Sequence, residues 1–129
     1  MNFIFNVANP PANTPVTLVG TAGKDVIFGT GYGDVLTGGA AADQFVFAPN
    51  GGPGTAQHTI TDFVTGLDKI DLRGFNNIST FSDVTLLESQ QGNDTLITLD
   101  SHDTLLLKNV ALVNLHANDF ILHPGVSST

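Results

Sequence analysis

Between residues 20 and 47 the chain alternates short apolar segments with turns that are rich in glycine and aspartate. Segments of this kind are typical of short β-strands, because glycine and aspartate favour turns and interrupt helices. Longer runs of β-branched and leucine residues follow, and residues 100–103 form a predicted hairpin turn between two of them. Strands are predicted at residues 1–8, 16–19, 59–64, 69–72, 83–89, 94–99, 103–108 and 119–122, a loop at 50–54 and one helical turn at 114–118. The pattern therefore predicts an all-β fold without a helix of ordinary length.

The turns between residues 20 and 46 repeat with a period of nine. Each unit opens with glycine and has aspartate at its sixth position and an apolar residue at its eighth. The three units read Gly20-Thr-Ala-Gly-Lys-Asp25-Val-Ile27-Phe, Gly29-Thr-Gly-Tyr-Gly-Asp34-Val-Leu36-Thr and Gly38-Gly-Ala-Ala-Ala-Asp43-Gln-Phe45-Val. A single unit would be as well explained by an ordinary β-turn, whereas three units in phase favour one structural element built repeatedly.

These units resemble the calcium-binding nonapeptide of RTX (haemolysin-type) proteins. The resemblance implies a short parallel β-roll, in which six residues of each unit form a turn, three form a strand, and two units complete one turn of the roll. Calcium would lie between turns stacked on the same edge, so that the first unit faces the third. Calcium takes roughly 6–8 oxygen ligands and accepts backbone carbonyls beside carboxylates, and glycine permits the turns that aim carbonyls at one point.

The resemblance also implies which residues bind the metal. On one edge, the site pairs Asp25 with Asp43, with carbonyl oxygens near Gly20, Ala22, Gly38 and Ala40. On the other edge, Asp34 is joined by carbonyl oxygens near Gly29 and Gly31. The fourth-position glycine of the repeat is kept as Gly23 but replaced by Tyr32 and Ala41, so one to three ions are expected and not a long ladder.

Residues 59–72 resemble the segment that follows the roll in the C-terminal domain of serralysin-type metalloproteases, through an Asp-Phe…Gly-x-Asp-Lys-Ile-Asp-Leu signature. Relatives often have aspartate at the position of His58, which is implicated in their last calcium site. Because calcium prefers oxygen to imidazole nitrogen, the edge that contains Asp34 is expected to bind weakly. Two roles stay open for Asp62, Asp68 and Asp71: turn formation and capping, or metal ligation, with Asp62 and Asp71 as the candidate ligands.

Residues 92–122 resemble the end of proteins exported by type I secretion, where a hairpin precedes a Leu-x-x-x-Asp-Phe-Ile strand. The resemblance implies a β-sandwich-like antiparallel C-terminal cap and an export signal within residues 59–129, and a closing strand without a targeting role is the alternative. The domain is expected to span residues 16–129, with the repeats at 20–46. A strand and a proline-rich linker at residues 1–15 precede it.

Composition and charge limit the classes of binding partner that can be expected. The chain has 129 residues, a net charge of −8, no cysteine, and only four lysine or arginine residues. One domain is expected at this length, and nucleic-acid or anionic-membrane binding is disfavoured, because no basic patch could meet phosphate groups. A cation is the natural partner. No segment predicts membrane insertion, and the N-terminus is not expected to act as a Sec signal peptide because it has no basic region or proper apolar region, so export would use another route.

The sequence therefore predicts a calcium-binding RTX-type module of a secreted bacterial protein, not an enzyme. It would fold on extracellular calcium and leave the cell through a type I ABC transporter, alone or with an N-terminal passenger domain. The alternative is a calcium-dependent carbohydrate-binding or adhesive module with a polysaccharide partner, although tryptophan is absent and Tyr32 is the single tyrosine. Catalysis is disfavoured because His58 and Asp62 lack a nucleophile and no His-Glu-x-x-His motif is present.

Overall fold

Each nine-residue unit ends in a strand of three or four residues. The repeats give β3 (Asp25–Phe28), β4 (Val35–Thr37) and β5 (Gln44–Val46). The computed structural model describes residues 2–5, 17–29, 33–47 and 56–122. The other strands are β1 (Asn2–Phe5), β2 (Thr17–Val19), β6 (Ala56–Ile60), β7 (Lys69–Asp71), β8 (Glu88–Gln91), β9 (Asp94–Thr98), β10 (Asp103–Leu107) and β11 (Phe120–Ile121). The helices are α1 (Phe81–Leu87) and two 3-10 turns, η1 (Leu112–Asn114) and η2 (Ala117–Asp119).

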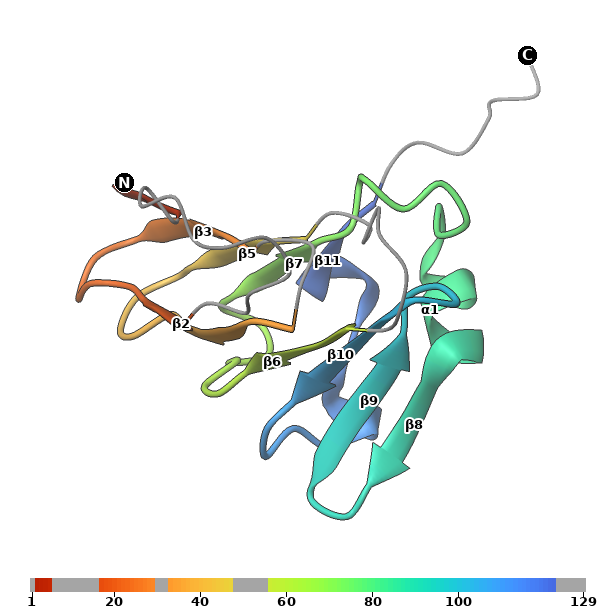
Figure 1. Ribbon diagram of the computed structural model, residues 1–129. Coiled ribbons are helices and arrows are strands. Elements are labelled where there is room, and N and C mark those ends of the chain that lie inside the picture. The colour runs from red at the N-terminus through yellow and green to blue at the C-terminus, as the bar shows by residue number, and fades with distance from the viewer. Residues whose placement is uncertain (1, 6–16, 30–32, 48–55, 123–129) are drawn as a thin grey trace.

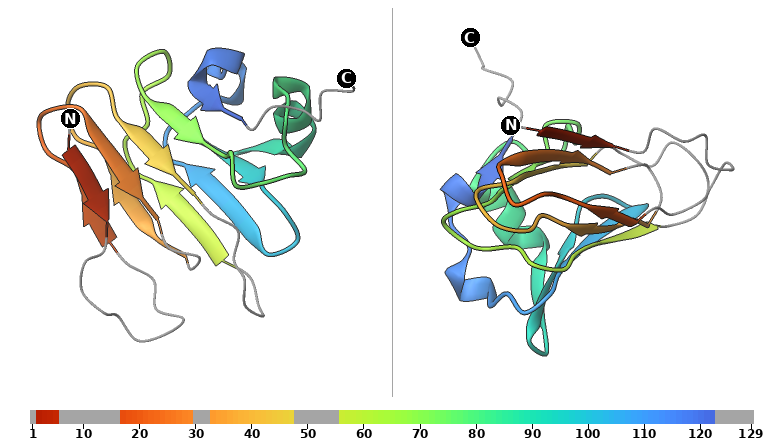
Figure 2. Two further views of the ribbon diagram at one scale, coloured as in Figure 1. Left: turned by 90° about the horizontal axis from the view of Figure 1, so that it is seen from above. Right: turned by 90° about the vertical axis from the view of Figure 1, so that its left-hand side faces the viewer.

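From β1 to β8, successive strands alternate between two sheets that face each other, whereas β8, β9 and β10 all belong to the second (Figures 1 and 2). The first sheet has the order β1-β3-β5-β7-β11 and is parallel throughout. The second has the order β2-β4-β6-β10-β9-β8, parallel from β2 to β10 and antiparallel from β10 to β8. Two strands thus complete one turn of a parallel β-roll, and the prediction of a mostly β fold with parallel sheets is confirmed.

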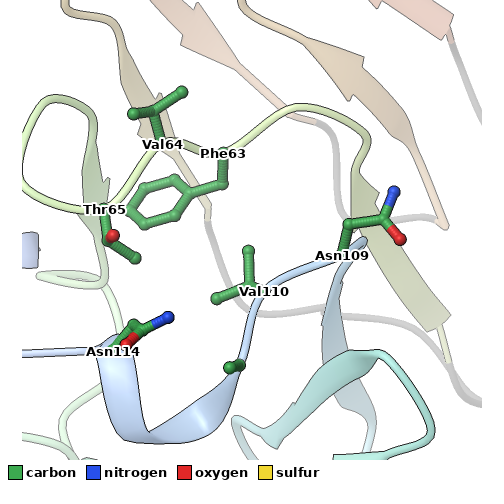
Figure 3. Close-up of a pocket in the computed structure, with 7 residues that line it drawn as sticks. Phe63, Val64, Thr65, Asn109, Val110 and Asn114 are labelled. Atoms are coloured by element: carbon green, nitrogen blue, oxygen red, sulfur yellow. The ribbon is translucent and has the colours of Figure 1, made fainter.

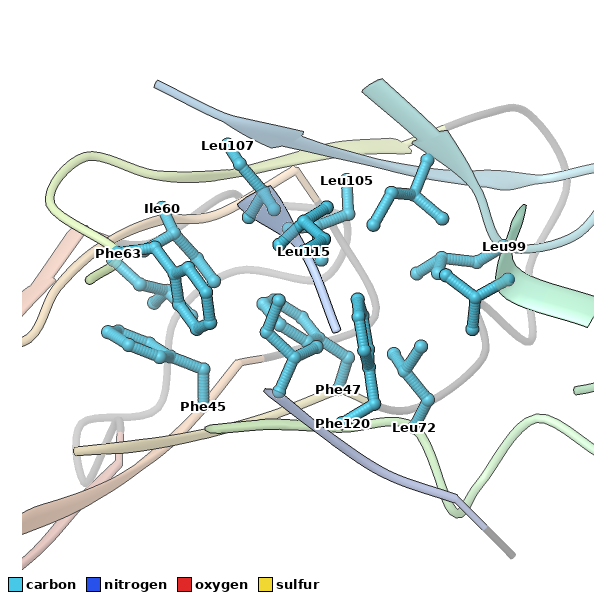
Figure 4. Close-up of a cluster of buried hydrophobic side chains, with 14 of the residues drawn as sticks. Phe45, Phe47, Ile60, Phe63, Leu72, Leu99, Leu105, Leu107, Leu115 and Phe120 are labelled. Atoms are coloured by element: carbon cyan, nitrogen blue, oxygen red, sulfur yellow. The ribbon is translucent and has the colours of Figure 1, made fainter. Parts of the chain in front are cut away.

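The apolar eighth residue of each unit points between the two sheets. Ile27 lies beside Phe45 and Phe45 beside Ile70 in one sheet, while Leu36 lies beside Ile60 in the other. All five side chains are fully buried, and the same core continues into the C-terminal part of the chain through leucines and phenylalanines of later strands (Figure 4). Burial of this apolar surface is the main favourable term that holds the sheets together.

The strand predicted at residues 83–89 is wrong, because residues 81–87 form helix α1. The Thr80 hydroxyl accepts a hydrogen bond from the Asp83 N–H, and the Asp83 carboxylate accepts one from the Thr80 N–H. This capping box satisfies two N-terminal amides and favours a helix over the strand that the apolar run suggested. The chain returns to a strand at Glu88, where β8 begins.

Other predicted elements are recovered with shifted ends. The hairpin around residues 100–103 is confirmed by the antiparallel pairing of β9 with β10. The strand expected at 59–64 is β6, which ends earlier at Ile60 because residues 61–68 form a turn. The helical turn expected at 114–118 is divided between η1 and η2. The proline-rich linker and the loop at 50–54 lie outside the described residues, and no described helix is long and apolar enough to cross a membrane.

Ala41, which replaces a glycine of the repeat, keeps the backbone conformation that glycine favours, with φ at 65°. This conformation costs a residue with a Cβ atom about 1–2 kcal/mol, and the greater entropy of glycine in the unfolded chain offsets part of the gain from substitution. Ala41→Gly is therefore expected to stabilise the domain by about 1 kcal/mol, measured as a rise in unfolding temperature of roughly 4 °C.

The matched control is Ala40→Gly, which changes the neighbouring exposed alanine at a position without positive φ. It is expected to destabilise the domain slightly, because only the entropy of the unfolded chain changes. Equal effects of the two substitutions would contradict the assignment of strain to Ala41.

Candidate metal centre

One edge of the roll is formed by stacked turns that each end in a buried aspartate. Asp25 opens β3, while Asp43, Asp68 and Asp119 directly precede β5, β7 and β11. Each of these four side chains is no more than 2% exposed. Because the strands that they precede are neighbours in one parallel sheet, the carboxylates line the same edge. This edge, residues 20–25, 38–43 and 61–68, is called the first edge below.

Hydrogen bonds tie these turns together in sequence. The Asp25 N–H donates to Asp43 Oδ1 at 2.9 Å, and the Asp43 N–H donates to Asp68 Oδ1 at 2.9 Å. Asp62 joins the same edge from the turn after β6 and accepts hydrogen bonds from the N–H groups of Gly38 and Gly39, both at 2.8 Å. The carboxylates thus hold successive turns in register and are brought close to one another.

The Asp43 carboxylate is only half satisfied. Its Oδ2 atom is buried and has no hydrogen-bond partner, although the side chain is only 2% exposed. Burial raises the pKa of Asp43 from 3.8 to about 6, the hydrogen bond from Asp25 lowers it, and the neighbouring carboxylates of Asp68, Asp25 and Asp62 raise it. An ionised, buried and unpartnered oxygen among like charges is unfavourable unless the carboxyl takes up a proton or a cation compensates its charge.

Backbone oxygens approach the same place because glycine leaves room for them. A Cβ atom on Gly20 would overlap the Gly38 carbonyl oxygen and lie 2.6 Å from Asp25 Oδ2. A Cβ atom on Gly38 would lie 2.5 Å from Asp43 Oδ2, and one on Gly39 would lie 2.5 Å from the Thr21 carbonyl oxygen. Any side chain at these glycines would fill the space between the turns.

These donors suit a hard cation. The first edge offers carboxylate and carbonyl oxygens, the ligands that calcium prefers, and no nitrogen or sulfur donor that would favour zinc or copper. Within the described ranges, no three His, Asp or Glu side chains converge as a ready metal cluster. Backbone carbonyls would therefore complete the coordination, and the residues of the first edge fit calcium in this way.

The second edge, on the opposite side of the roll, is different. Asp34 precedes β4 and is fully buried, and its Oδ2 atom lies 3.7 Å from Nδ1 of His58. The other ring nitrogen, Nε2, lies 3.3 Å from Oδ1 of Asp103 at the start of β10. The centroid of the imidazole ring is 5.2 Å from that of Phe47. Nitrogen thus occupies the middle of this edge, where the first edge has oxygen.

The sequence matches the family model described as Peptidase M10 serralysin C terminal over residues 12–124, which is most of the chain. The chain belongs to the serralysin C-terminal family. A search of curated proteins gives no match. Members of the serralysin C-terminal family are RTX-type calcium-binding modules of proteins that type I systems export, and they form the non-catalytic part of those peptidases.

The structure divides the residues predicted as ligands of this serralysin C-terminal domain. The first edge brings together Gly20, Asp25, Gly38, Asp43 and Asp62, with Ala22 and Ala40 exposed in the same turns. Gly29 and Asp34 lie on the second edge, and Gly31 lies outside the described residues. Asp119 was missed at this edge, and Asp68, for which capping and ligation had both stayed open, was not among the predicted ligands. Their sequence signal is an aspartate just before a short apolar strand, but the long turn at 61–68 breaks the nine-residue period.

Asp71 serves another purpose in the serralysin C-terminal fold. Its carboxylate forms an ion pair with Arg73, 2.7 Å between Oδ2 and Nη2, and accepts a hydrogen bond from Gln44. Burial raises the pKa of Asp71, but the hydrogen bonds from Arg73 outweigh it, so the pKa lies below the ordinary value. This arrangement favours the turn-forming role of Asp71 over ligation.

A pocket of the described residues offers little support for carbohydrate binding. It lies beside the turn after β6 and is lined by Phe63, Val64, Thr65, Asn109, Val110, Ala111 and Asn114 (Figure 3). Its volume is about 230 Å³, below the roughly 300–1,000 Å³ typical of small-molecule sites. The ring of Phe63 is 94% buried in the core (6% exposed), so it provides no exposed platform for a sugar.

The raised pKa of Asp43 predicts a pH dependence for the calcium-free domain. A carboxyl whose folded pKa exceeds its unfolded value stabilises the fold most below the unfolded value, here 3.8, and this stability is lost as the pH rises through about 6. The pKa of Asp68 is also raised, first of all by burial, and acts in the same direction. In chelator, the unfolding temperature should therefore fall between pH 5 and pH 7, measured by thermal melts at constant ionic strength.

Calcium should weaken this pH trend, because it favours the ionised carboxylates. Asp43→Asn should weaken it in chelator, because the main titrating group is absent. An equal fall in both proteins would assign the trend to groups other than Asp43.

Proposed function

We propose that this domain binds calcium at its first edge, folds fully only when that ion is present, and so supports the export and extracellular stability of the protein that contains it. The observation that carries the proposal is the buried, unpartnered Oδ2 of Asp43, on a carboxylate close enough to those of Asp68, Asp25 and Asp62 for their charges to raise its pKa. Family membership supports the same function, because RTX domains bind calcium.

The physical basis is the balance of charge at the first edge. Without a cation, buried carboxylates repel one another and lose their hydration, which opposes closure of the turns. Calcium that binds only the folded edge adds stability by mass action, about 2.7 kcal/mol when its concentration is 100 times the dissociation constant. A chain whose first edge stays open at low cytosolic calcium and closes at millimolar extracellular calcium is suited to export before its folding is complete.

The partners follow from this function. The domain, residues 16–129, would use its C-terminal part, residues 59–129, as the signal for a type I ABC transporter. An N-terminal passenger domain is a further candidate partner. The strand and linker at residues 1–15 would then connect the two.

Export and folding can be tested separately in a bacterial host that carries a type I transporter. Wild type and Asp43→Asn are expected to reach the medium in equal amounts. The wild type should resist added protease at millimolar calcium and become sensitive in chelator, whereas Asp43→Asn should respond far less to calcium. Protease resistance of the wild type in chelator equal to that in calcium would contradict the proposal.

A further inference from the structure

We propose that His58 replaces the metal at the second edge: its imidazole ring stands between the buried carboxylates of Asp34 and Asp103, so this edge takes no calcium ion. The inference rests on the proposed function only in that calcium binds at the first edge. A metal ion would then close the first edge of the roll, and the side chain of His58 would close the second.

Strand register identifies His58 as the counterpart of an aspartate. On the first edge, Val26 pairs with Gln44, so the preceding residues Asp25 and Asp43 stand side by side. On the second edge, Val35 pairs with Thr59, so the preceding residues are Asp34 and His58. Where the first edge has a second carboxylate, the second edge therefore has an imidazole.

The surroundings of His58 leave that ring as the bridging group. His58 and Asp34 are fully buried and Asp103 is 1% exposed. Nε2 of the ring is hydrogen-bonded to Asp103 Oδ1 at 3.3 Å, while Nδ1 lies 3.7 Å from Asp34 Oδ2 and makes no hydrogen bond, so the ring stands between the two carboxylates and is fixed from the Asp103 side. Phe47 packs against the ring, and the backbone closes in at Gly33, where a Cβ atom would lie 2.9 Å from the Gln57 carbonyl oxygen.

This arrangement disfavours calcium for two reasons. An ion between Asp34 and its neighbour would meet an imidazole nitrogen in place of the oxygen ligand that calcium prefers. The ring also keeps the Asp103 carboxylate on its far side, out of reach of an ion held by Asp34. The imidazole ring instead fills the space beside Asp34 and is hydrogen-bonded to Asp103 in β10, the inner strand of the C-terminal hairpin.

Counting bound calcium ions in the full chain tests the inference, with calcium alone as the probe and native mass spectrometry or calorimetry as the measurement. His58→Asp restores a carboxylate opposite Asp34 and is expected to bind one more ion per chain than the wild type. Asp34→Asn is expected to bind as many ions as the wild type. His102→Asp is the matched control, because it adds the same charge at an exposed histidine, and it should gain no ion.

Loss of one ion in Asp34→Asn would overturn the inference, because it would place calcium at the second edge of the wild type. A folded His58→Asp domain that gains no ion would overturn it as well. If His58→Asp fails to fold at any calcium concentration, the count for Asp34→Asn decides. A wild type that binds no ion contradicts the proposed function instead, and His58→Asp still tests the second edge by gaining an ion or not.

Discussion

Asp43→Asn is expected to remove most of the stability that calcium gives, while leaving the calcium-free domain at least as stable as the wild type. The amide keeps an oxygen that can accept the hydrogen bond from the Asp25 N–H. It also removes a buried charge beside Asp25, Asp62 and Asp68 and places an N–H₂ group where Oδ2 lacks a partner. The same substitution thus relieves repulsion without metal and removes a ligand when metal is present.

The effect should be large because a ligand's contribution to stability depends on its affinity. At calcium concentrations about 100 times the wild-type dissociation constant, one site adds about 2.7 kcal/mol, or roughly 10 °C in unfolding temperature for a domain of this size. Thermal melts in calcium and in chelator measure this gain, and Asp43→Asn should show only a small fraction of it.

Asp94→Asn is the matched control. Asp94 also accepts hydrogen bonds, from the Asn109 N–H and from Lys108, but at the C-terminal hairpin and away from the first edge. Its substitution should lower the unfolding temperature by the same small amount with and without calcium. A full calcium response in Asp43→Asn would exclude Asp43 as a ligand.

Calcium removal from the wild type is expected to loosen the two edges unequally. The turns of the first edge should lose amide protection by about 100-fold, the equivalent of the 2.7 kcal/mol that one ion supplies, because the repulsion between their carboxylates is then no longer offset by a cation. The second edge is held by His58, and β9 and β10 pack the fully buried Ile97, Leu105 and Leu107 into the core. These strands should keep most of their protection.

Hydrogen exchange followed by mass spectrometry, in calcium and in chelator, measures this difference by segment. Peptides that cover residues 20–25 and 38–43 should exchange faster on chelation, and peptides from residues 94–107 should change little. Uniform loss of protection over all segments would show that calcium holds the whole domain and not one edge of it.

The repeat made the roll predictable from the sequence. A period of nine fixes both where β3, β4 and β5 lie and that Asp25 faces Asp43, because identical units stack with identical register. The prediction was weaker where local chemistry decides. The hydrogen bonds between Thr80 and Asp83 favour a helix at residues 81–87, where the apolar pattern predicted a strand. Binary patterning does not contain that information.

The partners of the candidate site were less predictable than its repeat residues. Asp68 reaches Asp43 across the irregular turn at residues 61–68, and Asp103 reaches His58 across 45 residues of chain. No repeat or motif in the sequence signals either contact, because both depend on how the two sheets pack together. The resemblance already indicated that His58 is a poor calcium ligand, but its contact with Asp103 could be identified only from the structure.

Circular dichroism of the isolated chain tests most directly whether calcium binding completes the fold. The β signal and the unfolding temperature are measured as calcium is added and then removed with a chelator. Magnesium at equal concentration is the control ion. Calcium is expected to increase the β signal and to raise the unfolding temperature by roughly 10 °C or more. Chelation should reverse both changes, and magnesium should reproduce little of either. A spectrum and an unfolding temperature that are the same in calcium and in chelator would contradict calcium-dependent folding.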